Sequence, residues 1–151
     1  MILEIEELHQ KDVVAVSKLI DRSFSKSVAS TLTNEGVITF MSGLTSESIE
    51  KRLASGNTFI VCRNETSIVG VAEIRDNNHL NLLFVEPSIQ RKGIGRKLLL
   101  NLVDRVLGNQ ITVNSSLNSI DAYIKFGFQK TGPKSEVKGI RYQPMAYEIR
   151  L

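Results

Sequence analysis

The chain of 151 residues carries 19 Lys and Arg against 16 Asp and Glu, giving a net charge of +3, and 42% of its residues are hydrophobic. This composition is typical of a globular protein, and we expect residues 1–151 to form a single domain with its own core. The mild basicity, with only 6 Phe and 3 Tyr, excludes the dense basic face or stacking platform of a dedicated nucleic-acid binder.

The single cysteine, Cys62, excludes an internal disulfide and a cysteine-built zinc site, so we expect no metal. The N-terminal stretch MILEIEELHQ is too acidic for a signal peptide, and its apolar run is too short. No apolar stretch reaches the roughly 18 residues of a membrane span. We therefore predict a cytoplasmic protein with no membrane partner.

The first half of the chain predicts a mixture of helices and antiparallel strands. Val16, Leu19, Ile20 and Phe24 recur at helical spacing, and Pro87 ends a strand because it has no N–H to donate. The expected elements are an edge strand at 2–8, a helix from Asp12, an irregular or broken helical stretch at 27–43, a helix at 47–54, and consecutive antiparallel strands at 58–64, 67–76 and 79–87.

The second half predicts two further helices and a C-terminal hairpin. Leucines and valines form an apolar stripe after Gly93, and Gly108 follows that stripe as a stop signal. The expected elements are a helix at 93–107, a short strand at 111–113, a helix at 118–126 closed by Gly127, and a hairpin from 128–132 and 140–151.

Two glycines, Gly93 and Gly95, lie between a strand and a helix N-terminus. Positive side chains are unfavourable at that end of a helix unless an anion binds there, and glycines let the backbone approach a phosphate. The alternative interpretation of these residues is an ordinary glycine turn whose basic side chains face solvent. Leu98 replaces the third glycine of the dinucleotide fingerprint, and no P-loop string occurs. The flanking basic residues are Arg91, Lys92, Arg96 and Lys97.

The stretch LLFVEPSIQRKGIGRKLL resembles the acetyl-CoA signature of the GNAT superfamily of N-acetyltransferases, a strand ending V-x-P followed by Q/R-x-x-G-x-G/A and a helix. The stretch ITVNSSLNSIDAYIKFGF is similar to the superfamily's next motif, with Ser116 where an asparagine is frequent. The matching residues are Val85, Pro87, Gln90, Gly93, Gly95, Tyr123, Gly127 and Phe128. The resemblance, over residues 80–128, implies an α/β fold of the α+β type: a mixed, mostly antiparallel sheet with helices on both faces.

The resemblance also implies a set of residues that bind acetyl-CoA. Backbone amides at the helix N-terminus would hold the pyrophosphate, and the preceding strand would splay from its neighbour and pair with the pantetheine arm. Asn114 and Ser119 would lie along the same cofactor, although Asn114 equally fits a turn residue. The implied residues are Leu83, Phe84, Val85, Gln90, Arg91, Lys92, Gly93, Ile94, Gly95, Arg96, Asn114, Ser119 and Tyr123.

The implied chemistry is direct attack of an amine on a thioester. A backbone N–H near Val85 would stabilise the oxyanion. Tyr123 is the candidate acid for the leaving thiolate, and the alternative is a core tyrosine anchored by its hydroxyl.

Two residues are candidates for the base. His79 opens the strand that ends at Val85, where better-known members carry a catalytic Glu or His, but it also fits a polar turn partner. Glu73 stands in an apolar strand, where a carboxylate needs a role or a partner such as Arg75. A two-residue turn at Asn77 and Asn78 would put Glu73 and His79 on opposite faces, and a three-residue turn would put them on one face.

The resemblance therefore predicts an N-acetyltransferase that uses acetyl-CoA as co-substrate and a small-molecule or peptide amine as acceptor. The alternative is a non-catalytic acetyl-CoA-binding regulatory protein of the same fold. Nucleic acid is not an expected partner, and a homodimer is possible because it is common in this fold. Residues 25–57 are expected to form the acceptor side, with Glu35, Glu47 and Glu50 either attracting a cationic amine or facing solvent.

Overall fold

The computed structural model describes residues 2–65, 67–89 and 93–149. The strands are β1 (Leu3–Glu7), β2 (Thr58–Asn64), β3 (Ser67–Arg75), β4 (His79–Val85), β5 (Gln110–Ser115), β6 (Gln129–Lys130), β7 (Ser135–Val137) and β8 (Ile140–Glu148). The helices are α1 (Val13–Ser27), α2 (Asn34–Ser42), α3 (Ser46–Ala54), α4 (Ile94–Val103) and α5 (Ile120–Phe126).

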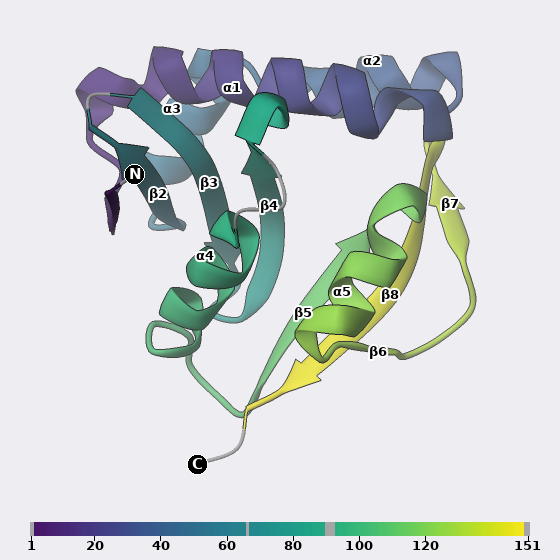
Figure 1. The fold of residues 1–151 in the computed structure, drawn as a ribbon. Coiled ribbons are helices and arrows are strands. Elements are labelled where there is room, and N and C mark those ends of the chain that lie inside the picture. Colours follow the sequence, from purple (N-terminus) through teal and green to yellow (C-terminus); the bar gives the residue numbers. More distant parts are fainter. Residues whose placement is uncertain (1, 66, 90–92, 150–151) are drawn as a thin grey trace.

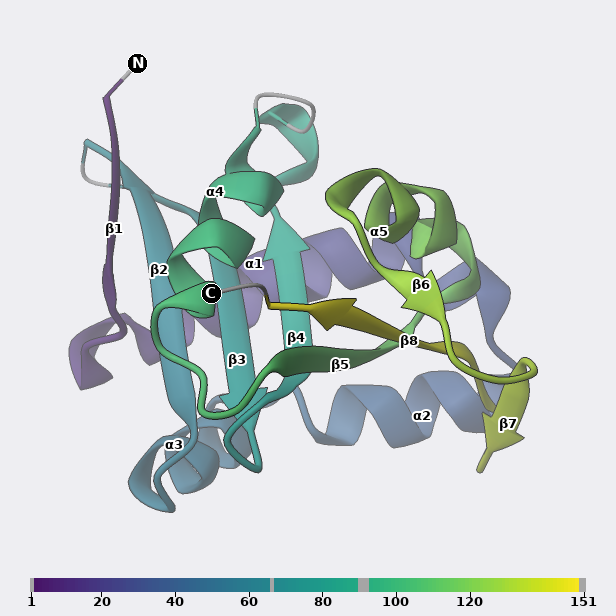
Figure 2. The same ribbon diagram turned by 90° about the horizontal axis from the view of Figure 1, so that it is seen from below.

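The strands form one open mixed sheet with helices on both faces (Figure 1), which confirms the predicted fold class. The strand order is β1-β2-β3-β4-β5-β8-β6, with β7 paired to β8. All described pairings are antiparallel except β4 with β5, which are joined by a crossover through α4. Figure 2 shows α4 in front of β2–β4 and α1 behind them.

Each face of the sheet has its own hydrophobic core. The core on the α4–α5 face includes Leu98 and Leu102 from α4, and the core on the α1–α3 face includes Val16 and Phe24 from α1. The helical spacing predicted for α1 is therefore confirmed, because its predicted apolar positions are buried. The sheet is therefore the middle layer between two groups of helices, and each group packs on its own core.

The parallel pair β4–β5 is short. Its Cα partners are only His79↔Thr112 and Leu80↔Val113, and Figure 1 shows the two strands diverging toward their C-terminal ends. On the other side β4 stays paired with β3 up to Gly70↔Val85. The sheet therefore opens along the second half of β4.

The β3–β4 turn combines the two predicted alternatives. The pair Arg75↔His79 encloses a three-residue turn, with left-handed φ values of 52° at Asp76 and 71° at Asn77. The register then shifts, and Glu73 pairs with Leu82 as a two-residue turn would require. This β-bulge reverses the alternation of the strand. Leu80 packs in the core of the α4–α5 face, and Leu82 packs in the core of the α1–α3 face.

Helix α2 forms where the sequence predicted an irregular or broken helical stretch. Thr33 caps it, since its side-chain oxygen accepts from the Gly36 N–H at 3.1 Å. A Cβ on Gly36 would lie 2.1 Å from the carbonyl oxygen of Gly139, so only glycine allows this close approach to the β7–β8 turn. The glycine lowers the helix propensity of the segment, but tertiary packing overrides this.

Other elements also differ from the predictions, most of all α4, β5 and β7. Helix α4 ends at Val103 rather than near residue 107, because the N–H groups of Arg105 and Val106 both bond to Leu102 O and the Leu107 N–H bonds to Asn77 O. Strand β5 is longer than expected because β8 pairs along its whole length. Strand β7 was not predicted, and β8 pairs with it as well as with β6.

Candidate active site

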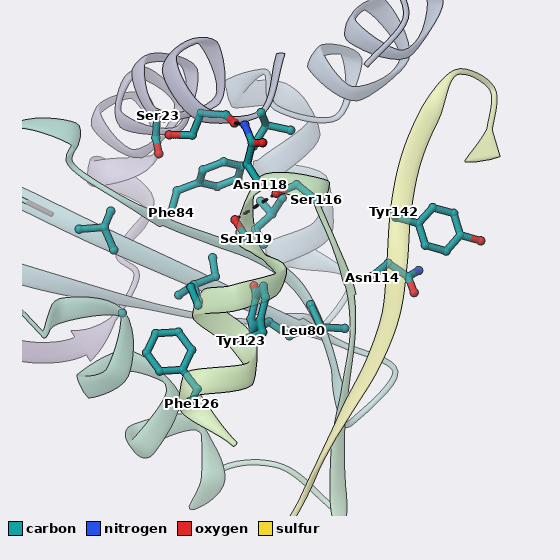
Figure 3. Close-up of a pocket in the computed structure, with 18 of the residues that line it drawn as sticks. Ser23, Leu80, Phe84, Asn114, Ser116, Asn118, Ser119, Tyr123, Phe126 and Tyr142 are labelled. Atoms are coloured by element: carbon teal, nitrogen blue, oxygen red, sulfur yellow. Dashed lines mark hydrogen bonds between the residues drawn. The ribbon is translucent and has the colours of Figure 1, made fainter. Parts of the chain in front are cut away.

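A cleft with a volume of about 740 Å³ occupies the opening between β4 and β5. It is lined from β4, β5, the N-terminus of α4, α5, the C-terminal half of α1, α2 and the start of β8 (Figure 3). All of the predicted cofactor residues that the structure describes line it, namely Leu83, Phe84, Val85, Gly93, Ile94, Gly95, Arg96, Asn114, Ser119 and Tyr123. Gln90, Arg91 and Lys92 lie outside the described residues.

The N-terminus of α4 has the features of an anion site. Gly93 is its N-cap with φ +78°, a conformation that favours glycine, and no heavy atom lies within 4 Å of where a Cβ would stand. The Lys97 N–H donates to Gly93 O at 3.0 Å, so the N–H groups before it are those a helix leaves without an internal acceptor. Arg96 is exposed at the cleft and forms no ion pair with any described residue. A pyrophosphate fits this backbone and this charge.

The opened edge of β4 offers a second, neutral binding element. After Leu80 the described β4–β5 ladder ends, so residues 81–84 have no strand partner on that side. Backbone groups along such an edge bind an extended ligand in the manner of an added strand. This edge runs from the sheet opening toward the N-terminus of α4, so both elements fit one long ligand with an amide-rich arm and an anionic end.

Tyr123 lies on α5 with its ring buried at the cleft wall. It is 7% exposed and packs edge-on against Phe128 with ring centroids 5.1 Å apart. No described residue forms a hydrogen bond with its hydroxyl, which leaves that group to a ligand in the cleft (Figure 3). Burial raises the pKa of Tyr123, so the phenol stays protonated and is available as a donor.

A family model described as "Acetyltransferase (GNAT) domain" matches residues 28–149. The chain belongs to this GNAT acetyltransferase family. A GCN5-related N-acetyltransferase from Rhodopseudomonas palustris has a similar fold, with a TM-score of 0.81, 17% identity and 99% of both chains covered. The PaiA N-acetyltransferase from Thermoplasma acidophilum, in complex with coenzyme A, gives a TM-score of 0.78 at 19% identity over 98% of this chain and 99% of that chain. The predicted family is therefore confirmed.

An aminoglycoside 6′-N-acetyltransferase complexed with coenzyme A is also similar, with a TM-score of 0.74 and 16% identity over 100% of this chain and 98% of that chain. Identities this low establish the shared fold. The short, diverging β4–β5 pair agrees with the splayed strand that the sequence resemblance implied.

His79 is not among the described residues that line the cleft of this GNAT protein. Its Nδ1 lies 2.8 Å from Thr112 Oγ1 on β5, at the closed end of the sheet opening. Five residues of β4 lie between it and Val85, which is about 20 Å further along the strand. Burial, and then the charge of Arg75, lower the pKa of His79. Tyr123 lines the cleft and His79 does not, so the two side chains do not face the same space.

Glu73 is fully buried, and its partner is not Arg75 as the sequence suggested. Its Oε2 accepts from Arg52 Nε at 2.7 Å and from Asn57 Nδ2 at 2.8 Å, and its Oε1 accepts from Asn81 Nδ2 at 3.0 Å. Arg75 instead donates to Asn81 Oδ1 at 3.2 Å. The bulge at Asn81 explains this, since it turns Asn81 toward Glu73 while Arg52 reaches in from α3. Glu73 itself does not line the cleft.

Part of the cleft was not predicted from the sequence. It includes Ser23 on α1, Asn118 before α5, and Arg141 and Tyr142 on β8. Of residues 25–57, those lining the cleft are Ser27, Val28, Leu32 and Phe40, and the exposed Glu35, Glu47 and Glu50 do not. Phe40 stacks on Phe24 with ring centroids 4.7 Å apart. For this wall the sequence offered the expected acceptor segment 25–57, which contains Phe40, and the helical spacing that buries Phe24.

Within the described ranges, no group of three or more His, Cys, Asp or Glu side chains is placed to hold a metal ion. No helix in the same part of the chain has the length and apolar character needed to cross a membrane.

Proposed function

We propose that this GNAT protein is an N-acetyltransferase that moves an acetyl group from acetyl-CoA to a primary amine in a ternary complex, with residues 1–151 acting as one domain. One observation carries the proposal: the open glycine cap of α4, the unpaired edge of β4 at residues 81–84 and the Tyr123 hydroxyl share a single cleft. Relatives of the same fold have structures with coenzyme A.

The reaction forms a C–N bond between the amine and the acetyl carbon and breaks the C–S bond of the thioester. The amine nitrogen loses one proton, and the leaving sulfur gains one, so the products are an amide and a free thiol. The chain contributes by holding both reactants in the cleft, which can supply several kcal/mol.

Tyr123 acts at the leaving sulfur as a hydrogen-bond donor. A thiol has a reference pKa of about 8.5, below that of a phenol, and burial raises the pKa of Tyr123 further. Complete transfer of the phenolic proton to the thiolate is therefore uphill. A fixed donor that stabilises the developing negative charge needs no such transfer.

The amine needs to be neutral when it attacks. Neither a carboxylate nor an imidazole is found among the described residues that line the cleft. The proposal therefore relies on binding the neutral amine, and a base role for His79 or Glu73 stays a prediction that the pH dependence of the rate tests.

The test is a thermal shift followed by turnover. Acetyl-CoA at 100 times its dissociation constant should raise the free energy of unfolding by about 2.7 kcal/mol, and NAD should do much less. Release of free thiol with a panel of amines then separates an enzyme from a non-catalytic regulator, which would bind without turnover. A shift with NAD and none with acetyl-CoA would sink the proposal.

A homodimer and a cytoplasmic location also stay predictions, which sedimentation analysis and cell fractionation would test.

A further inference from the structure

One end of the cleft is built from apolar and aromatic side chains on the α1–α3 face of the sheet. We call it the acceptor end, and it is lined by Val28, Leu32, Phe40, Phe84, Ile140 and Tyr142. The first four belong to, or pack against, the core on that face. The two from β8 stand beside α2, where the Thr33 N–H bonds to Gly139 O at 3.4 Å. This end is therefore separate from the N-terminus of α4, which lies on the opposite face.

The charged side chains among the described residues that line the cleft are all of one sign. The charged side chains among its described lining residues are Arg96, Lys125 and Arg141, and no described Asp or Glu lines it. Glu136 pairs with Arg141 at 3.1 Å but does not itself line the cleft. An acceptor that brought a second ammonium group into this space would lose hydration and find no carboxylate in return.

The hydroxyl of Ser23 is a buried polar group beside this apolar wall. Ser23 on α1 is 2% exposed and lines the cleft, and its hydroxyl forms no hydrogen bond with any described residue. In the described part of the chain, every fully buried polar side-chain atom has a hydrogen-bond partner. The Ser23 oxygen has none, so it is not fully buried and faces the open space of the cleft (Figure 3). A hydroxyl held in this way is a donor and acceptor for a bound molecule.

We propose that the acceptor end selects a small primary monoamine with an apolar or aromatic body, which Ser23 helps to orient, and that it rejects polyamines and other polycations. This inference rests on the proposed function and names its acceptor class. The reaction stays the balanced transfer described above, with one C–N bond formed and one C–S bond broken. The described lining residues carry positive charge and no carboxylate, which also favours the neutral form of a bound amine over its ammonium form.

The experiment compares acceptors at fixed, saturating acetyl-CoA with free thiol as the readout. 2-Phenylethylamine should show a kcat/KM at least tenfold above those of spermidine, kanamycin and a lysine-containing peptide. A kcat/KM for any of these three that equals or exceeds that of the aromatic amine overturns the proposal. If no aromatic or aliphatic monoamine is turned over while acetyl-CoA still gives its thermal shift, the acceptor class is wrong but the cofactor site stands. If the acetyl-CoA shift is also lost, the proposed function itself fails.

Two variants make the assignment specific to this end. Ser23→Ala should raise KM for 2-phenylethylamine about tenfold and leave acetyl-CoA affinity unchanged, while Ser25→Ala, at an exposed position of the same helix, should change neither. Leu32→Glu, at a half-buried lining position, should narrow the gap between spermidine and the aromatic amine at least tenfold. The amine would have to bind elsewhere if both serine variants had the same KM for 2-phenylethylamine and if Leu32→Glu kept the same preference for the aromatic amine over spermidine.

Discussion

The cleft has two ends, and they differ in how the chain builds them. The cofactor end comes largely from one continuous strand, loop and helix, β4 to α4, with α5 beside it. The acceptor end combines α1 and α2, which follow one another in sequence, with β8, which begins only at Ile140. A contiguous site leaves a local pattern of glycines and apolar residues. A site assembled by tertiary packing leaves no such pattern, and only the structure shows it.

The largest expected effect concerns the buried ion pair between Glu73 and Arg52, on the same face of the sheet as the acceptor end. Glu73→Gln removes the buried charge that pairs with Arg52, and we expect the free energy of unfolding to fall by about 3 kcal/mol, because a partly buried guanidinium is left without a counter-ion. Glu86→Gln, which breaks the exposed pair with Arg22, is the matched control and should cost less than about 1 kcal/mol. Urea unfolding measures both. Equal losses would mean that the buried pair gives no special support.

The second prediction concerns the boundary between the two ends. Tyr123→Phe keeps the ring and its contact with Phe128 but removes the hydroxyl, so kcat should fall about 10²-fold while acetyl-CoA affinity stays the same. Tyr147→Phe removes a hydroxyl that does not line the cleft and should leave kcat unchanged. Steady-state kinetics with titration of acetyl-CoA checks both. Full activity in Tyr123→Phe would leave positioning as the main source of catalysis.

The third prediction acts on the cofactor end alone. Gly93→Ala places a Cβ into open space at φ +78°, where it strains the backbone and obstructs the approach of a pyrophosphate, so acetyl-CoA affinity should fall about tenfold. Gly56→Ala has the same kind of strain at φ +103° and the same open surroundings but lies outside the cleft. Calorimetric titration should show weaker binding only for the Gly93 variant. Equal affinities would place the anion site elsewhere.

The smallest effect concerns His79. Its pKa is lowered, mainly by burial, so below its ordinary value of about 6.5 the unfolded chain binds more protons than the folded one. The wild-type free energy of unfolding should therefore fall, relative to His79→Gln, as the pH drops from about 7 through 6.5 toward the lowered folded value. The acidic limb of the rate profile should stay in the variant. Loss of that limb would instead identify His79 as the base.

The sequence predicted the elements of the cofactor end because each has a local cause. Gly93 takes a positive φ at a helix start, and Gly127 takes one at a helix end. Each of these helix ends depends on a few residues adjacent in sequence, so a short sequence pattern predicts it.

Other features depend on contacts that no local pattern encodes. The bulge at Asn81 follows from the polar partners it gains across β3, and Glu73 finds Arg52 rather than the adjacent Arg75 because α3 packs over that face. Helix α2 contains a glycine that only the approach of Gly139 explains. The acceptor end was located only as residues 25–57, because Ser23 on α1, Phe84 on β4 and the residues of β8 lie outside that segment.

The position of β8 in the sheet has a consequence for folding. Strands β2, β3 and β4 form a meander of neighbours, whereas β8 follows every other described element and yet lies between β5 and β6. Closing such a long loop costs entropy before its contacts repay it, so we expect the meander and α4 to order first and β8 to insert late. Since β8 carries Ile140, Arg141 and Tyr142, the nascent protein would acquire its cofactor end before its acceptor end, and acetyl-CoA could stabilise an intermediate that has no place yet for the amine.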